Sequence, residues 1–111
     1  RKFEEKITLK KLKLNNSVIS LGGGAFLNKK IKKEILENHL SFWLNWDHKI
    51  LLRRIKNSPK RPLTLKASEN DLIDLIKKRS KTYSKALYEI RCDNLSKNEV
   101  VNKILEIYET N

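Results

Sequence analysis

The stretch SVISLGGG at residues 17–24 joins a short uncharged run, containing two β-branched residues, to three consecutive glycines. The run is typical of a buried strand, and the glycines predict a loop at its carboxyl end. In open parallel sheets ligands bind beyond the carboxyl ends of the strands, where glycine lets backbone N–H groups approach them closely. The glycines alone are equally compatible with a flexible turn. They do not form a G-x-x-x-x-G-K-[ST] phosphate loop, because they are the only glycines in the chain.

On both sides of this stretch, segments with helical spacing alternate with short apolar runs. Strands are predicted over 17–21, 40–46 and 88–92, and a loop over 57–67. Helices are predicted over 2–14, over 29–38 with Asn28 as its cap, from Asp47, from Ser68 and from Ser96. The helix from Ser68 is expected to break near Ser80 and to continue over 83–88. Capping boxes are expected at Ser68 with Asp71 and at Ser96 with Glu99. Such alternation predicts an α/β fold, a parallel sheet covered by helices, in one domain over 1–111.

Composition limits the function classes. The formal charge of the 111 residues is +12, and the lysines are spread along the chain with few aromatic residues among them. This favours a general compositional bias over a nucleic-acid-binding surface, which needs stacking platforms. Cys92 is the only cysteine, which excludes an internal disulfide and favours the cytoplasm. No apolar run is long enough to cross a membrane.

Five motifs occur in an informative order: Arg1-x-x-Glu4, VISLGGGAF, LLRRI followed by KRPL, KKRSKTY, and a terminal S-x-x-E-V-V helix. In this order and approximate spacing the chain resembles the later two-thirds of shikimate kinases. The resemblance implies a partial three-layer P-loop kinase-type fold whose first two strands are missing. It also implies ATP-dependent phosphorylation of a shikimate ring hydroxyl in aromatic amino-acid biosynthesis. Since the chain contains no Met and starts at Arg1, we expect a fragment.

The resemblance implies a substrate site made of residues from several motifs. The residues expected to bind shikimate are Arg1, Glu4, Gly22, Gly23, Gly24 and Arg79. This assignment agrees with the chemistry of the substrate, because a planar guanidinium holds a carboxylate through two parallel hydrogen bonds. Taken singly, Arg1 and Arg79 are also compatible with ordinary solvated charges on helices.

The resemblance further implies that the loop at 57–67 is the lid that closes over ATP. Arg61 would reach the phosphates and act in catalysis, Pro62 would lie beside it, and Arg54 would lie against the adenine. An arginine that arrives by closure stabilises the charge of the transferring phosphoryl group. The alternative is a proline-stiffened basic loop without a ligand.

The chain departs from the family pattern in two places. Its lid reads RPLT where RPLL is usual, and the late nucleotide contact maps only loosely, near Ser96 or Lys97. His39 and His48 match no metal-ligand spacing, and no metal site is expected in these residues.

Phosphoryl transfer needs a phosphate loop, Mg²⁺ ligands and an aspartate that positions the attacking hydroxyl. The resemblance places all three outside these residues, so we expect little activity from the chain alone. The family's strand order, 2-3-1-4-5, would leave inner strand edges unpaired here, which predicts poor stability or self-association. A complete protein is expected to be a monomer that binds shikimate and Mg·ATP, and neither nucleic acid nor membrane.

Three alternatives remain open at this point: a related small-molecule kinase, a relative that binds without turnover, and a basic nucleic-acid-binding module. The last predicts binding that weakens steeply with salt.

Overall fold

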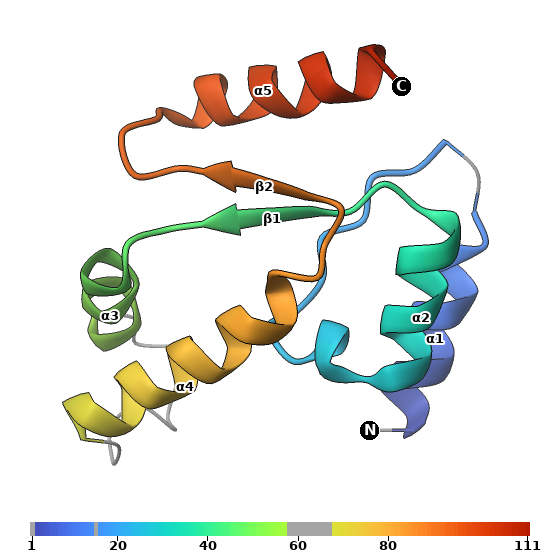
Figure 1. Ribbon diagram of the computed structural model, residues 1–111. Helices are drawn as coiled ribbons and strands as arrows, with labels where there is room; N and C mark the ends of the chain where they lie inside the picture. The colour runs from blue at the N-terminus through green and yellow to red at the C-terminus, as the bar shows by residue number, and fades with distance from the viewer. Residues whose placement is uncertain (1, 15, 58–67) are drawn as a thin grey trace. The chain divides into compact units, whose positions relative to one another are not determined.

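The computed structural model describes residues 2–14, 16–57 and 68–111. The chain divides into two compact units, Arg1–Ser41 and Phe42–Asn111. Each unit contains its own helices, and each is described here by itself (Figure 1).

The first unit is built from helix α1 (Lys2–Leu12), the short 3₁₀ helix η1 (Ala25–Leu27) and helix α2 (Lys29–Asn38). Helix α2 packs against both α1 and η1. Their shared apolar core contains Leu12, Phe26, Ile31 and Ile35, all buried. The predicted helices over 2–14 and 29–38 are confirmed to within two residues, although Phe3 and Ile7 remain exposed.

The strand predicted over residues 17–21 is wrong. The sheet of the described residues contains only β1 (Phe42–Asn45) and β2 (Tyr88–Arg91), and Val18 is fully exposed. A strand needs a hydrogen-bonded neighbour, and the strand order implied by the resemblance places this one between two strands that the 111 residues lack. The segment follows Asn16, whose φ of 56° is the left-handed conformation that asparagine tolerates.

The second unit is a parallel β-α-β arrangement with a further helix. Its elements are β1, helix α3 (His48–Lys56), helix α4 (Glu69–Tyr83), β2 and helix α5 (Lys97–Glu109). Strands β1 and β2 pair in parallel with Phe42 opposite Tyr88, and α5 packs against β2 (Figure 1). Parallel strands need a long crossover connection, which α3 and α4 provide. The predicted strands over 40–46 and 88–92 are therefore confirmed in shortened form.

The second unit has its own apolar cluster. Ile90, Cys92 and Val100 are buried at its centre, and Phe42, Trp46, Leu95 and Ile104 pack against them. The rings of Phe42 and Tyr88 stack across the two strands with centroids 5.4 Å apart. The cluster joins β1, β2 and α5, so the carboxyl ends of the two strands lie against packed apolar side chains.

The helix starts were predicted accurately. Asn28 accepts hydrogen bonds from the backbone of Lys30 and Ile31, and Asp47 accepts one from Lys49. Both expected capping boxes form, at the starts of α4 and α5. Short polar side chains satisfy backbone N–H groups that a helix cannot pair internally, so these starts are readable from local sequence.

The break predicted in α4 near Ser80 is wrong, as is the helical continuation over 83–88. Helix α4 runs without interruption to Tyr83, and the chain then turns and enters β2 at Tyr88. Serine has only a slightly lower helix propensity than the best helix formers. The packing of the buried residues Leu72 and Ile76 of α4 outweighs this small cost at Ser80. In the part of the chain that the structure describes, no helix is long and apolar enough to cross a membrane.

Candidate functional site

The glycine turn lies between the extended segment at 17–21 and η1. The amide of Ala25 donates to the carbonyl of Gly22 at 3.1 Å, which closes the turn. A Cβ added at Gly22 or Gly24 would meet open space, and no described glycine has a positive φ. The backbone therefore does not require glycine at these two positions, and the open space beside them is where a ligand can approach.

Glu4 lies in the first turn of α1 and is exposed. Its neighbour Glu5 accepts a hydrogen bond from the side chain of Asn28 at 2.7 Å, and Lys30 lies 3.6 Å from the same carboxylate. The hydrogen bond from Asn28 is the main cause that lowers the pKa of Glu5 below its ordinary value, with the charge of Lys30 adding to it against the opposing effect of burial. These contacts hold the first turn of α1 at the start of α2, which directly follows the glycine turn and η1.

Sequence reasoning missed Glu5. An amide cap and a carboxylate 23 residues apart give no local signal, since both look like ordinary surface residues. The contact joins the first turn of α1 to the start of α2 within the first unit. Arg1, the other predicted residue of this motif, lies outside the described residues.

Arg79 lies in α4, in the second unit. Its Nε is buried and has no hydrogen-bond partner among the described residues. A buried guanidinium nitrogen without an acceptor costs free energy. The predicted substrate residues thus come from both units: Glu4 and the glycines from the first, Arg79 from the second.

Arg54 lies in the last turn of α3 and is exposed. Its guanidinium carbon lies 4.1 Å from the ring centroid of Trp46, within the range of a cation–π interaction. Trp46 comes directly after β1 and packs on the apolar cluster of the second unit. Sequence reasoning assigned Arg54 to the adenine and assigned no role to Trp46. Arg61, which was predicted to act in catalysis, and Pro62, which was predicted to bind ATP, lie outside the described residues.

The carboxyl ends of β1 and β2 are tied together by backbone contacts. The amide of Cys92 donates to the carbonyl of Asn45 at 2.9 Å, and the amide of Asp47 donates to the carboxylate of Asp93. Burial raises the pKa of the Cys92 thiol, the charge of Asp93 adds to this, and the charge of Arg54 opposes it. The thiol is therefore protonated at neutral pH and is no nucleophile.

The late nucleotide contact expected near Ser96 or Lys97 has no clear candidate here. The hydroxyl of Ser96 accepts the amide of Glu99 in the cap of α5. Since the hydroxyl already holds the helix start, its role in the structure is that of a cap.

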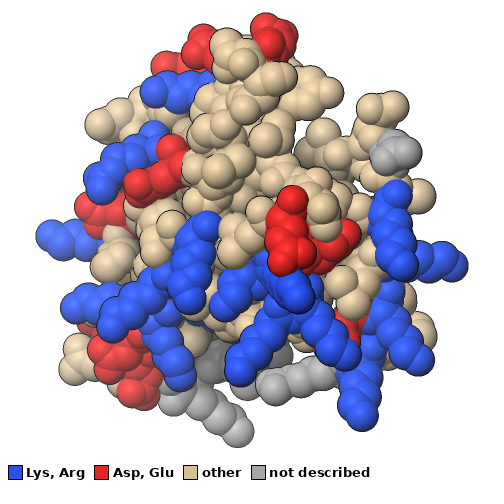
Figure 2. All heavy atoms as spheres, turned by 45° about the vertical axis from the view of Figure 1, so that its right-hand side comes forward, with Lys and Arg blue, Asp and Glu red and all other residues tan. Residues whose placement is uncertain are grey.

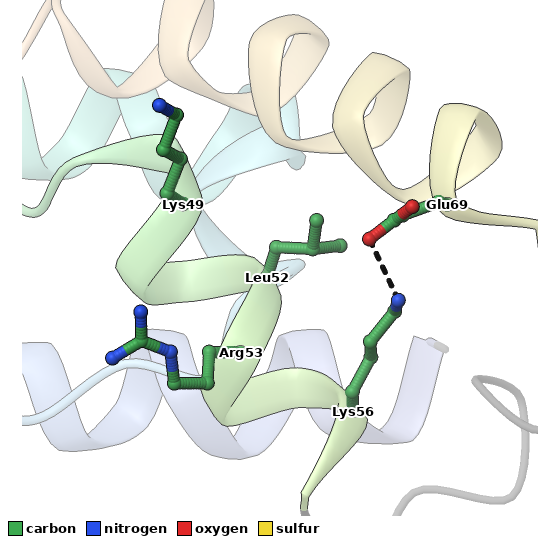
Figure 3. A pocket seen from close by; sticks show the side chains of 5 residues that line it. All are labelled: Lys49, Leu52, Arg53, Lys56 and Glu69. Carbon is green, nitrogen blue, oxygen red and sulfur yellow. Dashed lines mark hydrogen bonds and ion pairs between the residues drawn. The ribbon is translucent and has the colours of Figure 1, made fainter.

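A hollow of about 310 Å³ lies between α3 and α4 (Figure 3). The described residues that line it are Lys49, Leu52, Arg53, Lys56 and Glu69. Lys56 pairs with Glu69 at 2.7 Å, while the guanidinium of Arg53 points away from this ion pair. The cationic groups do not converge, so the hollow offers no anion site, and none of its described residues was assigned to a ligand.

The described basic side chains have acidic side chains among them. On the face drawn in Figure 2, carboxylates of Asp and Glu lie among the Lys and Arg side chains. Two of the described ion pairs join Lys30 to Glu5 and Lys56 to Glu69. Within the described ranges, no group of three His, Cys, Asp or Glu side chains is placed to hold a metal ion.

Comparison with known proteins decides the family. The model of the shikimate kinase family matches residues 1–109. The chain belongs to the shikimate kinase family. It is 32% identical over 106 residues to the shikimate kinase of Bartonella quintana, and 32% identical over 109 residues to that of Caldicellulosiruptor bescii. These matches cover 95% and 97% of this chain, but 50% and 63% of the relatives, so the chain spans about half to two-thirds of their length.

A solved structure supports the fold. The crystal structure of a shikimate kinase from Bacteroides thetaiotaomicron superposes with a TM-score of 0.76 at 23% sequence identity. The match covers 98% of this chain and 65% of that one. The predicted α/β class, a partial kinase fold of this family with a parallel sheet, is thereby confirmed.

Proposed function

We propose that the polypeptide carrying this chain transfers a phosphoryl group from ATP to a ring hydroxyl of shikimate, in aromatic amino-acid biosynthesis. Family membership supports an ATP-dependent phosphotransferase. The chain would supply the substrate clamp and the part of the nucleotide site near Arg54. We further propose a monomeric, cytoplasmic enzyme that uses Mg²⁺.

The observation that carries the proposal is the match of the shikimate kinase family over residues 1–109, a range that includes the KKRSKTY motif with Arg79. Shikimate has a carboxylate and three hydroxyl groups. The family resemblance supports Arg79 as the group that holds the carboxylate, and Glu4 and the glycines as groups that contact the ring. Binding at several points fixes the orientation of the reacting hydroxyl, which is the main task of the protein in phosphoryl transfer.

The test is shikimate-dependent release of ADP from Mg·ATP by the native polypeptide that carries residues 1–111. Arg79→Ala is expected to lower kcat/KM for shikimate by about 10- to 100-fold, because a charge-assisted hydrogen bond to a carboxylate is lost. Arg79→Lys should recover only part of this loss, since lysine lacks the planar fork.

Lys78→Ala is the matched control. Lys78 is an exposed basic residue of the same helix, and its removal should leave kcat/KM unchanged. A folded wild-type protein without shikimate-dependent turnover would contradict the proposal and favour another hydroxylated substrate or a non-catalytic relative. If Arg79→Ala and Lys78→Ala lowered kcat/KM for shikimate equally, the assignment of Arg79 to the shikimate carboxylate would be contradicted.

A further inference from the structure

We propose that Trp46 is a positioning residue, which holds the guanidinium of Arg54 flat so that its second face can stack on the adenine of ATP. This inference rests on the function proposed above, in which Arg54 lies against the base. The Arg54 guanidinium carbon lies 4.1 Å from the centroid of the Trp46 ring. A planar guanidinium has two faces, so one that stacks on an indole keeps its second face open.

Trp46 is itself held in place by contacts on both sides of it in the chain. The carbonyl of Asn45 accepts the amide of Cys92 at 2.9 Å, and the amide of Asp47 donates to Asp93. The indole also packs against the buried cluster of Ile90, Cys92 and Val100, which leaves it only partly exposed. A ring fixed in this way is a rigid platform.

Arg54 has no comparable support of its own. It is exposed, it lies in the last turn of α3 beside the like charges of Arg53 and Lys56, and none of the ion pairs found in the described residues involves it. A long arginine side chain loses much rotamer freedom when it is ordered. Because the indole orders the guanidinium before the nucleotide arrives, less of that cost falls on binding.

The arrangement also explains why the base should lie on Arg54 and not on Trp46. Trp46 packs against the apolar cluster and is only partly exposed, whereas Arg54, which lies over its ring, is exposed and is the more accessible planar group of the pair. Every base has a π-face that stacks on a guanidinium plane. The stack of indole, guanidinium and adenine is the arrangement that the geometry points to.

Trp43 provides an internal comparison. It lies in β1, and its ring centroid is 6.5 Å from that of Tyr83, so its described ring contact is structural. Trp43→Leu therefore removes an equally large indole from the same strand region and leaves the Arg54 stack intact.

The experiment measures KM for ATP, KM for shikimate and kcat in the native polypeptide with Trp46→Leu, Trp46→Phe and Trp43→Leu. Trp46→Leu is expected to raise KM for ATP about two- to fivefold, the loss expected for an exposed cation–π contact. KM for shikimate and kcat should stay within error. Trp46→Phe keeps an aromatic face and should restore most of the affinity, and Trp43→Leu should leave KM for ATP unchanged.

A double-mutant cycle separates positioning from packing. In an Arg54→Ala background, Trp46→Leu should have no further effect on KM for ATP, because the group it positions is gone. A thermal melt of each variant checks the fold, and Trp46→Met, which keeps more apolar volume, replaces the leucine variant if that one does not fold.

Three results would overturn the proposal: an unchanged KM for ATP in Trp46→Leu, equal increases in both KM values, or the same increase in the presence and absence of Arg54. Failure of the proposed function looks different, since the wild-type protein would then show no shikimate-dependent turnover. In that case the role of Trp46 is tested by calorimetry, which measures the dissociation constant of ADP for the same variants. An ADP affinity that Trp46→Leu does not change, or no ADP binding at all, also overturns the role of Trp46.

Discussion

At the scale of single residues, the structure separates positions that the fold needs from positions that only a ligand would need. Gly22 and Gly24 have no positive φ and no neighbour that a Cβ would meet. Arg79 has a buried nitrogen without an acceptor. Such features do not help the folded chain, which is why we propose these positions for ligand binding.

Gly22→Ala tests this distinction. We expect the free energy of unfolding to change by no more than about 0.5 kcal/mol, since the substitution is exposed and unstrained. KM for shikimate should rise, because the methyl group occupies the space through which the ring approaches. Denaturant unfolding and steady-state kinetics of the native polypeptide measure the two quantities. A loss of stability with unchanged KM would show that the glycine serves the turn instead.

At the scale of secondary-structure elements, the helix caps are the most local and most predictable features. The start of α5 is closed by Ser96 and Glu99, each accepting a backbone N–H of the other. Because α5 carries Val100 onto the apolar cluster of the second unit, its start also fixes the packing of β2.

Ser96→Ala should lower the free energy of unfolding of the native polypeptide by about 1 kcal/mol, the usual loss for an N-cap. Asn102→Ala, in the exposed middle of the same helix, is the control and should change stability little. Chemical denaturation with circular dichroism at 222 nm measures both. Equal effects of the two substitutions would mean that the cap does not stabilise α5.

The same cap predicts a pH dependence. Hydrogen bonds with Ser96, first its backbone N–H and then its side chain, lower the pKa of Glu99 below its ordinary value of 4.5. A lowered folded-state pKa stabilises the fold above the unfolded-state value, and this contribution is lost as the pH falls through the folded-state value. The stability difference between wild type and Glu99→Gln should therefore be constant above about pH 5.5 and shrink below pH 4.5. A difference that is the same at pH 3 and pH 7 would contradict this.

At the scale of the whole molecule, residues 1–111 contain only part of the family's sheet. Two strands of four residues each pair with one another, and segment 17–21 joins no sheet. An isolated pair of strands is marginally stable, and its outer edges offer unpaired backbone groups to other chains.

We therefore expect residues 1–111, expressed alone, to self-associate and to show no measurable shikimate-dependent ADP release. The second expectation follows from the absence of a G-x-x-x-x-G-K-[ST] loop in these residues. Light scattering after gel filtration, a thermal melt and the ADP assay test it. A monomer with a sharp cooperative melt at high temperature would contradict the first expectation, and turnover would contradict the second.

Local sequence by itself determined the helix starts at Asn28, Asp47, Ser68 and Ser96, the class of the fold and, through its motifs, the family. These depend on caps, periodicity and spacing, which neighbouring residues fix among themselves. The tertiary structure decided what depends on distant partners. It left segment 17–21 unpaired, carried α4 past Ser80, joined Glu5 to Asn28 and placed Arg54 on Trp46. A strand, a continuous helix and a stacked pair exist only when non-local groups meet, and no local pattern reports whether they do.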